Sequence, residues 1–567
     1  MVLFDALEDA AFRDVHDMGG TGTLKQLESE VGQAGKQEAL AEKLKGGDRV
    51  VLTFLGEGST SEGDFHEAVN VAAVWDLPVI FLIENNGYGL STPSSEQFRC
   101  KSFVDKAIGY GIEGVRVDGN NILEVYGTVK ELAESIRKKP RPFLLECVTF
   151  RMRGHEEASG TKYVPKELME EWAKKDPVEN YEKFLLEQGV LTTEAIEQIR
   201  KSIKKEIEAG LKIAFAETYP EPDTERELRD VYAPHISTEI KPESDKASEK
   251  RFVDAIREGL WQSMEKHPNL VLMGQDIAEY GGVFKITEGF VQKFGKERVR
   301  NTPLCESAIL GAALGLSIKD MKAMVEMQFA DFVSEGMTQI VNNLAKIHWR
   351  WGQQADVVVR MPTGAGTAAG PFHSQSNEAW FFHTPGLKVV YPSSPYDAKG
   401  LLCAAFEDPN PVMFFEHKYL YRSVKDLVPD DYYTVPIGKA RLIREGADFT
   451  VIAYGLAVYW VLEELDNLPQ VSADVLDLRT LLPWDKEAVE QSVRKTNRVL
   501  IVHEDTLTGG IGAEISAWLT EHCFTSLDAP VMRVASLDTP IPFAPTLEAN
   551  FLPKSRIRHA IEKLLAF

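Results

Sequence analysis

Cysteine is scarce in this 567-residue sequence, which contains five, and no two of them form a CxxC pair. The five are Cys100, Cys147, Cys305, Cys403 and Cys523. A sparse and odd-numbered set in a long chain excludes a disulfide framework and is typical of reduced intracellular thiols. Long apolar runs are absent too, because no stretch reaches the ~18–20 residues that a membrane-spanning helix needs.

Basic charge is in deficit, since the formal net charge is -23 at pH 7. Nonspecific binding of nucleic acid requires a basic surface, so this composition argues against it. The first residues, MVLFDALEDAAFRD, are rich in acids and fit neither a secretory signal nor an Arg-rich transit peptide. We therefore expect a cytoplasmic protein with no nucleic-acid or membrane partner.

Short apolar runs alternate with helical patterns along most of the chain, which is long enough for several domains. RVVLTFLG, LPVIFLIEN and RPFLLECVTF are typical of parallel strands covered on both faces. Runs of the same kind are NLVLMGQD, KAMVEMQF and DVVVRMP, and then FTVIAYG, SADVLDL and RVLIVHE. The pattern predicts an α/β protein with two doubly wound parallel-sheet domains and a further C-terminal α/β domain.

The predicted boundaries are 1–46, 47–218, 219–249, 250–436 and 437–567. Segment 219–249 carries four prolines without apolar periodicity, which predicts a linker. Segment 1–46 is too short to supply the first strands of a doubly wound sheet, although GKQEALAEKLKGGD can form a helix. We therefore expect the first domain to be incomplete at its start.

Two of the apolar runs end abruptly in glycines and polar residues. Gly56, Glu57 and Gly58 follow the first run, and Asn86 and Tyr88 follow the second. Each motif alone is more often a simple turn, but the carboxyl ends of parallel strands share one edge, where ligands of α/β proteins bind. The Glu57 carboxylate, the Asn86 amide oxygen and the Tyr88 carbonyl, with diphosphate oxygens and a water, would complete an octahedral Mg²⁺ site.

The two motifs together resemble the thiamine diphosphate signature, which opens with Gly-Asp-Gly and closes with Asn-Asn about this far apart. The resemblance implies that Glu57, Asn86 and the Tyr88 carbonyl bind the metal and that Gly56 and Gly58 approach the diphosphate. The departure is Glu57 in place of Asp. One extra methylene moves the carboxylate by roughly 1.5 Å, so the loop must recede or coordination weakens.

The segment RMRGHEEASG, after the third apolar run, carries His155. A loop histidine is more often structural, but this one resembles a histidine of the 2-oxoacid dehydrogenase α subunit, in the loop that covers the cofactor. That resemblance implies an active-site role for His155, with Arg151 adding positive charge near the diphosphate. In animal relatives a regulatory serine follows the histidine. Here Glu156 follows, which excludes phosphorylation at that position.

The stretch TPLCESAILGAALGL, with the nearby QFADF, resembles the β subunit of the same enzymes. Glu306 could be a plain helix N-terminal acid. It matches the family glutamate that hydrogen-bonds the aminopyrimidine ring of thiamine and drives formation of its imino tautomer. Phe332 matches the aromatic residue that packs on the pyrimidine, although an aromatic residue beside a strand is more often core.

His373, in the Gly/Ser-rich stretch GAGTAAGPFHSQS, matches the β-subunit histidine beside the substrate, a candidate proton donor or carboxylate contact. We expect His383, beyond the next helix, to be structural. The last region, with LIVHEDTLTGGIGAEI, resembles the C-terminal domain of transketolase-like enzymes. His503 and Glu504 in that region are expected to serve structure or subunit contacts.

The resemblance covers roughly residues 47–215 and 250–567. It identifies the chain as a thiamine diphosphate-dependent 2-oxoacid dehydrogenase first component with fused α and β subunits, of the thiamin diphosphate-binding fold. It implies oxidative decarboxylation of a 2-oxoacid and reductive acylation of a lipoyl group on a partner dihydrolipoyl acyltransferase. TPLCE, QFAD and FHSQS favour the branched-chain (2-oxoisovalerate) type. In the family the two half-sites meet across subunit interfaces, so a homodimer is expected.

Other functions stay open at this point. A pyruvate or acetoin dehydrogenase first component, or a transketolase, would use the same cofactor. A catalytically impaired, truncated product is the remaining alternative, favoured by Glu57 and by the missing counterpart of the family's early diphosphate-gripping segment. The sequence does not decide which 2-oxoacid is preferred.

Overall fold

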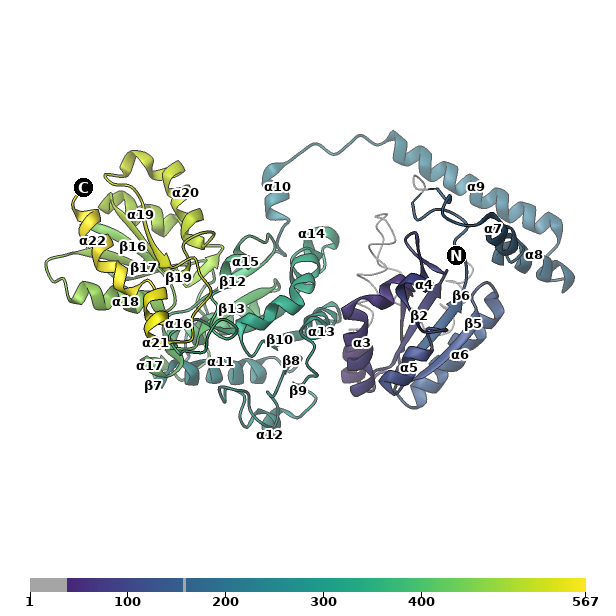
Figure 1. Ribbon diagram of the computed structural model, residues 1–567, viewed down its shortest axis with the longest axis horizontal. Helices are drawn as coiled ribbons and strands as arrows, with labels where there is room; N and C mark the ends of the chain where they lie inside the picture. Colours follow the sequence, from purple (N-terminus) through teal and green to yellow (C-terminus); the bar gives the residue numbers. More distant parts are fainter. Residues whose placement is uncertain (1–37, 157–159) are drawn as a thin grey trace. The chain divides into compact units, whose positions relative to one another are not determined.

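The computed structural model describes residues 38–156 and 160–567 of the chain (Figure 1). The chain divides into two compact units, Met1–Arg229 and Asp230–Phe567, called unit 1 and unit 2 below. Of the predicted segment 1–46, residues 38–45 are helical, as GKQEALAEKLKGGD predicted, and residues 1–37 lie outside the described residues.

Unit 1 contains a four-stranded parallel sheet in the order β1-β2-β6-β5. The strands are β1 (Val51–Gly56), β2 (Val79–Asn85), β5 (Glu113–Asp118) and β6 (Phe143–Val148). Figure 1 shows α3 (Gly63–Val74) and α6 (Ile122–Lys138) on opposite sides of this sheet. Residues 79–83 of the central strand β2 are buried, as expected for a strand with both faces covered. The three apolar runs of this region are therefore strands, as predicted.

Helix α6 illustrates how the sequence builds unit 1. The Asn121 side chain caps it by accepting a hydrogen bond from the Glu124 amide. Its buried residues have the spacing of one helix face, and this face packs on the sheet. They are Val129, Leu132, Ala133 and Ile136. The remaining elements of unit 1 are η1 (Gly58–Ser61), β3 (Tyr88–Gly89), β4 (Thr92–Pro93), α4 (Ser94–Gln97), α5 (Asp105–Tyr110), α7 (Lys166–Ala173), α8 (Pro177–Glu187), α9 (Thr193–Ala216) and α10 (Thr224–Arg229).

Unit 2 contains a seven-stranded sheet in the order β18-β12-β13-β11-β10-β8-β9. The strands are β8 (Leu270–Gly274), β9 (Val299–Asn301), β10 (Lys322–Glu326), β11 (Val357–Thr363), β12 (Lys388–Val390), β13 (Val412–His417) and β18 (Thr480–Leu482). All neighbours are parallel except β18, which is antiparallel to β12. The accompanying helices are α11 (Phe252–Lys266), α12 (Phe290–Phe294), α13 (Glu306–Ile318), η2 (Ala330–Gly336), η3 (Gln339–Leu344), α14 (Ile347–Trp351), α15 (Glu378–Phe382), α16 (Pro395–Glu407) and α17 (Leu420–Ser423). A separate antiparallel pair joins β7 (Ala247–Arg251) to β14 (Lys425–Pro429).

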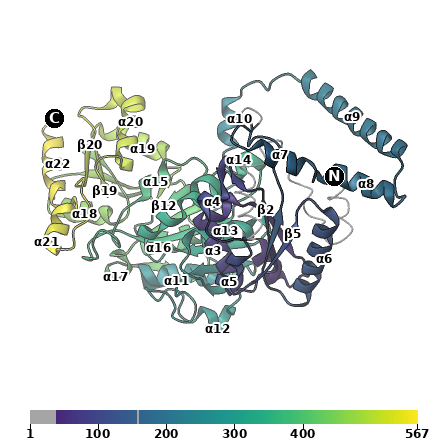
Figure 2. The same cartoon turned by 45° about the vertical axis from the view of Figure 1, so that its right-hand side comes forward.

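A second sheet of unit 2 has five strands in the order β15-β17-β16-β19-β20, parallel except for β15. The strands are β15 (Arg441–Arg444), β16 (Phe449–Ala453), β17 (Ala473–Asp477), β19 (Val499–Thr506) and β20 (Met532–Ser536). Its helices are α18 (Leu456–Asp466), α19 (Lys486–Thr496), α20 (Ile511–Cys523), η4 (Phe524–Ser526), α21 (Pro545–Phe551), η5 (Lys554–Arg556) and α22 (Ile557–Leu565). Figure 2 shows α20 and α22 beside β19 and β20. The strands predicted in both regions of unit 2 are present.

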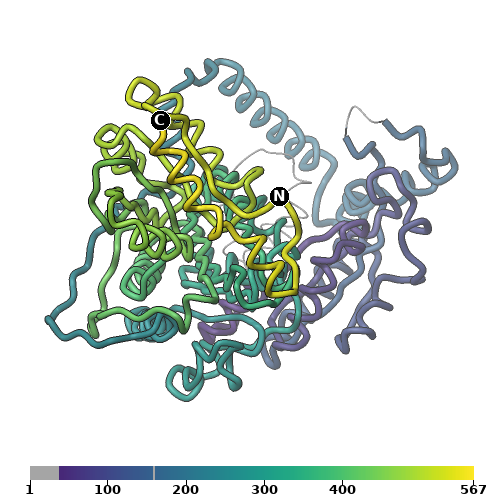
Figure 3. Tube along the Cα trace, turned by 60° about the vertical axis from the view of Figure 1, so that its left-hand side comes forward, coloured from purple at the N-terminus to yellow at the C-terminus, as the bar shows by residue number. Residues whose placement is uncertain are grey.

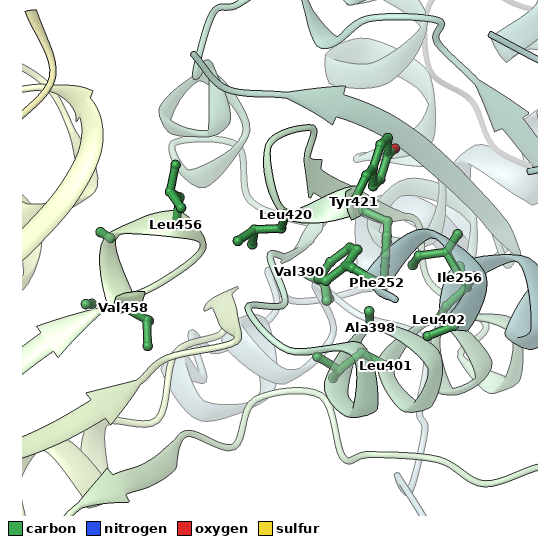
Figure 4. Close-up of a cluster of buried hydrophobic side chains, with 14 of the residues drawn as sticks. Phe252, Ile256, Val390, Ala398, Leu401, Leu402, Leu420, Tyr421, Leu456 and Val458 are labelled. Atoms are coloured by element: carbon green, nitrogen blue, oxygen red, sulfur yellow. The ribbon is translucent and has the colours of Figure 1, made fainter. Parts of the chain in front are cut away.

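The predicted domains 250–436 and 437–567 share both a sheet and a core. Strand β18 comes from the second region but extends the edge of the seven-stranded sheet. One hydrophobic cluster includes Phe252 and Leu402 from the first region and Leu456 and Val458 from the second (Figure 4). Side chains of the last region can therefore reach the seven-stranded sheet.

The second part of the predicted linker 219–249 packs within unit 2. Ala233 is buried, and its N–H donates to Asn410 Oδ1 at 2.7 Å. The N–H of Ile240 donates to Thr434 Oγ1 at 2.7 Å. Hydrogen bonds to distant residues thus hold residues 230–249 in place, and the amino-acid composition of the segment does not predict these bonds. Among the described residues, no helix is both long and apolar enough to cross a membrane.

Candidate active site

Glu57 lies immediately after β1 and is fully buried. Its Oε2 atom accepts a hydrogen bond from the backbone N–H of Asn86 at 3.1 Å. Its Oε1 atom is buried and has no hydrogen-bond partner. The structure thus brings together the two strand ends that the sequence placed at one sheet edge, and leaves one carboxylate oxygen unsatisfied.

Asn86 and Tyr88 form a tight turn beside this carboxylate. Asn86 Oδ1 accepts a hydrogen bond from the Tyr88 N–H at 3.2 Å, which fixes the side chain. A Cβ atom on Gly58 would lie 3.0 Å from the Cα atom of Gly89, so the loops after β1 and β2 approach closely. Gly58 keeps this approach possible because it has no side chain.

Arg151, in the loop after β6, contributes positive charge to the same edge. It donates hydrogen bonds to the Leu90 carbonyl and, at 2.9 Å, to the Tyr163 hydroxyl. Burial raises the pKa of the Glu57 carboxyl, while backbone amides, those of Asn86 and Tyr88 among them, and the charge of Arg151 act in the opposite direction. Burial prevails because water is excluded from a fully covered carboxylate.

His155 is half-buried in the loop that follows β6, and residues 157–159 of that loop lie outside the described residues. Its predicted role beside the cofactor stays a prediction. Gly56 is the last residue of β1, so it lies next to Glu57 as the sequence required.

The chemistry of this edge fits a bound cation. A buried, unpartnered carboxylate oxygen is costly unless a positive charge compensates it. Carboxylate, amide and carbonyl oxygens are ligands that Mg²⁺ prefers. Among the described residues no group of three or more His, Cys, Asp or Glu side chains could hold a metal. The predicted site has a single carboxylate, so it would draw its other ligands from amide, carbonyl and diphosphate oxygens.

Glu306 in unit 2 is the first residue of α13 and is half-buried. Its Oε1 atom accepts a hydrogen bond from Gln275 Nε2 at 2.8 Å. Gly336, at the end of η2, packs against this helix start, because a Cβ atom there would lie 3.3 Å from the Glu306 carbonyl oxygen. The carboxylate is therefore held in a defined orientation on a rigid element.

Phe332 and His373 lie together in unit 2. Their ring centroids are 5.6 Å apart in an edge-to-face arrangement, and Phe329 is also edge-to-face with His373 at 4.8 Å. Phe332 belongs to η2, the element that packs on the start of α13. Glu306, Phe332 and His373 therefore belong to neighbouring elements of one unit.

The structure gives different surroundings to His383, His503 and Glu504. His383 is exposed, whereas His503 is fully buried, and burial lowers its pKa to about 4. Glu504 is buried and accepts a hydrogen bond from the N–H of Ala365 at 2.6 Å, in the loop that carries His373. The hydrogen bond between Glu504 and Ala365 is thus a contact within one chain.

Three residues of the site were not singled out from the sequence. Gln275 follows a predicted strand, and Phe329 stands three residues before Phe332, so both had a positional signal. Glu146 is a charged residue inside the apolar run FLLECV. It is fully buried and accepts a hydrogen bond from Asn85 Nδ2 at 2.8 Å, which anchors the residue next to Asn86.

Three family models match the chain in order. They are the Dehydrogenase E1 component over residues 15–224, the Transketolase pyrimidine binding domain over 248–424 and the Transketolase C-terminal domain over 438–556. The chain is 46% identical over 322 residues to the 2-oxoisovalerate dehydrogenase subunit beta of Bacillus subtilis (strain 168), covering 56% of this chain and 98% of that protein. It is 44% identical over 331 residues to the mitochondrial 2-oxoisovalerate dehydrogenase subunit beta 2 of Arabidopsis thaliana, covering 57% and 91%.

The chain is also similar to an acetoin-oxidising enzyme subunit and to a solved transketolase. The chain is 42% identical over 316 residues to the beta subunit of acetoin:2,6-dichlorophenolindophenol oxidoreductase of Bacillus subtilis (strain 168), covering 53% of this chain and 92% of that protein. A solved split-gene transketolase, an inactive beta4 tetramer, is 22% identical with a TM-score of 0.46, covering 56% of this chain and 98% of that chain. The chain belongs to the thiamine diphosphate-dependent 2-oxoacid dehydrogenase E1 family and carries the E1-component region and the two transketolase-type regions in a single sequence.

Proposed function

We propose that this protein catalyses the oxidative decarboxylation of a branched-chain 2-oxoacid and the reductive acylation of a lipoyl group on a partner dihydrolipoyl acyltransferase. The structural observation that carries the proposal is the buried, unpartnered Oε1 atom of Glu57 beside Asn86. The choice of a branched-chain substrate follows the 2-oxoisovalerate names of the relatives.

Unit 1 would hold the diphosphate end of the cofactor. Glu57, Asn86 and the Tyr88 carbonyl would bind Mg²⁺, while Gly56 and Gly58 leave room for the diphosphate. Arg151 adds positive charge at this edge, and His155 would act at the active site from the loop that covers the cofactor. Glu57 is fully buried, so the low dielectric constant around its carboxylate would strengthen the attraction to a bound cation.

Unit 2 would hold and protonate the pyrimidine end. Thiamine diphosphate supplies a nucleophilic carbon and an electron sink when it is bound. Gln275 binds one oxygen of Glu306, and we assign the other oxygen, Oε2, to the proton shared with the pyrimidine nitrogen. Phe332 would pack on the pyrimidine ring. His373 would contact the substrate carboxylate or donate a proton to the reacting group.

The first test is calorimetric titration of the purified protein with thiamine diphosphate, with and without Mg²⁺. Metal-dependent binding is expected. The absence of binding would favour the catalytically impaired alternative. Binding would lead to steady-state assays with 3-methyl-2-oxobutanoate, pyruvate and acetoin, using an artificial electron acceptor and then a lipoyl domain. Higher kcat/KM with pyruvate than with the branched acid would overturn the substrate proposal.

Acetoin cleavage is the second candidate, because the acetoin-oxidising relative is 42% identical to this chain. Turnover of acetoin without turnover of any 2-oxoacid would favour it. A homodimer is part of the proposal, and sedimentation velocity of the cofactor-bound protein measures it. A monomer that is active under the same conditions would contradict that part.

A further inference from the structure

The loop that carries His373 consists of residues 364–377, between β11 and α15, and is called the His373 loop below. It has no regular strand or helix over this length. Buried backbone N–H groups need hydrogen-bond acceptors, so the partners of this loop determine where His373 lies. Two of them are carboxylates from the region 437–567, those of Glu504 and Glu548.

Glu504, on β19, binds both ends of the His373 loop. Its Oε1 atom accepts hydrogen bonds from the Ala365 N–H at 2.6 Å and from the Ser376 hydroxyl at 3.2 Å. Its Oε2 atom lies 2.7 Å from His417 Nε2. Glu504 is 5% exposed, so these bonds are shielded from water.

Glu548, in α21, binds the first turn of the same loop. Its Oε1 atom accepts a hydrogen bond from the Gly366 N–H at 3.0 Å, and Oε2 accepts one from the Ala368 N–H at 3.1 Å. Glu548 is 4% exposed. Hydrogen bonds in which an ionised carboxylate accepts are roughly twice as strong as neutral ones.

The charges of these carboxylates are compensated nearby. Lys418 is buried, and its Nζ atom donates to the Gly364 carbonyl at 2.8 Å, so the lysine also binds the loop. Burial lowers the pKa of Lys418 to about 8, and the charges of Asp331, Glu504 and Glu548 oppose this. A Cβ atom on Gly364, whose φ is +90°, would lie 2.2 Å from the ring of His417, so the loop approaches this cluster closely.

The other side of the loop rests on η2. Asp331 Oδ1 accepts a hydrogen bond from the Gln375 N–H at 3.2 Å, and Asn377 Nδ2 donates to the Ala330 carbonyl at 3.0 Å. Figure 3 shows the yellow C-terminal part of unit 2 beside its teal and green parts, where these elements lie. The loop is thus held between η2, which carries Phe332, on one side and the carboxylates of Glu504 and Glu548 on the other.

We propose that Glu504 and Glu548 are positioning residues, which hold the His373 loop so that the His373 ring stays edge-to-face with Phe329 and Phe332. The C-terminal region then acts on the reaction through His373, beyond the structural or subunit-contact role expected for Glu504. The inference rests on the proposed function only in giving His373 a role next to the substrate.

The test uses the full-length, cofactor-loaded protein and the substitution Glu548→Gln. A glutamine keeps the size but directs an N–H₂ group at backbone donors, so one loop amide loses its acceptor. Hydrogen–deuterium exchange of the peptide containing residues 364–377 is expected to rise about tenfold, while the strands keep wild-type exchange. With 3-methyl-2-oxobutanoate we expect kcat to fall by about 30- to 100-fold, because a displacement of ~1 Å can cost 10²-fold.

The matched control is Glu562→Gln, on the exposed face of α22, which should leave exchange and kcat unchanged. Glu504→Gln is the second variant and should raise exchange at both ends of the loop. Wild-type exchange of the loop in both carboxylate variants would overturn the positioning role, as would increased exchange with unchanged kcat. If the wild-type protein turns over no 2-oxoacid, the proposed function fails, and the exchange measurement still decides whether the carboxylates hold the loop.

Discussion

Glu57 in unit 1 and Glu306 in unit 2 are both carboxylates near the carboxyl end of a parallel strand, yet their surroundings differ. Glu57 is fully buried and keeps one oxygen without a hydrogen-bond partner. Glu306 is half-buried, and Gln275 binds one of its oxygens. A dehydrated and unsatisfied carboxylate favours a cation, whereas an oriented and accessible carboxylate is suited to exchange a proton. This difference is the basis for proposing metal binding for Glu57 and proton transfer for Glu306.

The substitution Glu306→Ala tests the proton-transfer side and should have the largest effect. We expect kcat to fall by about 10²- to 10⁴-fold, the usual contribution of a positioned acid or base. The Mg²⁺-dependent affinity for thiamine diphosphate should stay close to wild type. Steady-state turnover and titration calorimetry measure the two quantities. The exposed Glu265→Ala on α11 is the control, and unchanged turnover in Glu306→Ala would refute the tautomer role.

The substitution Glu57→Gln tests the metal side. The amide removes the charge but keeps the shape, so Mg²⁺-dependent affinity for the cofactor should fall by about 10- to 100-fold. Binding measured without Mg²⁺ should change little. The control is Glu131→Gln on the exposed side of α6. Equal metal dependence in the variant and the wild type would place the metal elsewhere.

Glu57 also predicts a pH dependence of stability without cofactor. Because burial raises the pKa of this acid in the folded state, the folded chain holds its proton to higher pH than the unfolded chain. The contribution of Glu57 to the free energy of unfolding is therefore largest at pH values below its pKa in the unfolded chain, about 4.5. This contribution is lost as the pH rises through the pKa of Glu57 in the folded chain. Denaturant unfolding at several pH values should show a smaller loss in Glu57→Gln, and an unchanged pH profile would contradict the burial of a titrating carboxyl.

Glu57 and Asn86 show which part of the site the sequence could predict. Their meeting follows from a parallel sheet, because adjacent strands of this type end at the same edge, and the structure confirms that proximity. The strands were also predictable, because strands covered on both faces are continuously apolar in sequence. Their role as metal ligands, and those of His155, Glu306 and His373, stay predictions.

The long-range hydrogen bonds of Glu504 and of residues 230–249 could not be predicted from the sequence. Glu504 and Glu548 lie 128 to 182 positions from the His373-loop residues that they bind, a separation that local patterns do not encode. The proline-bearing segment likewise forms hydrogen bonds with distant partners such as Asn410. Local pattern predicts which edge a residue occupies, whereas tertiary packing decides what holds it there.

The substitution Gln275→Ala tests the difference between Glu306 and Glu57, because it removes the hydrogen-bond donor of the Glu306 carboxylate. A hydrogen bond to a charged group contributes ~1.5–3 kcal/mol, so kcat should fall about tenfold or more while the cofactor affinity is retained. The exposed Gln354→Ala is the control. A fall in affinity without a fall in kcat would show that Gln275 serves binding and would break the assignment of Glu306 to proton transfer.

The substitution Asn86→Ala should have the smallest effect. It removes one neutral oxygen, whereas the charge of Glu57 and the Tyr88 carbonyl stay in place, so Mg²⁺-dependent affinity should fall by less than in Glu57→Gln, about three- to tenfold. The Tyr88 N–H also loses its 3.2 Å acceptor, which loosens the turn. Asn86→Ser, which keeps a short oxygen acceptor, separates the two contributions. If serine restores the turn but not the affinity, the lost oxygen was a metal ligand. An affinity in Asn86→Ala equal to wild type would leave Glu57 as the only side chain of this edge that the metal needs.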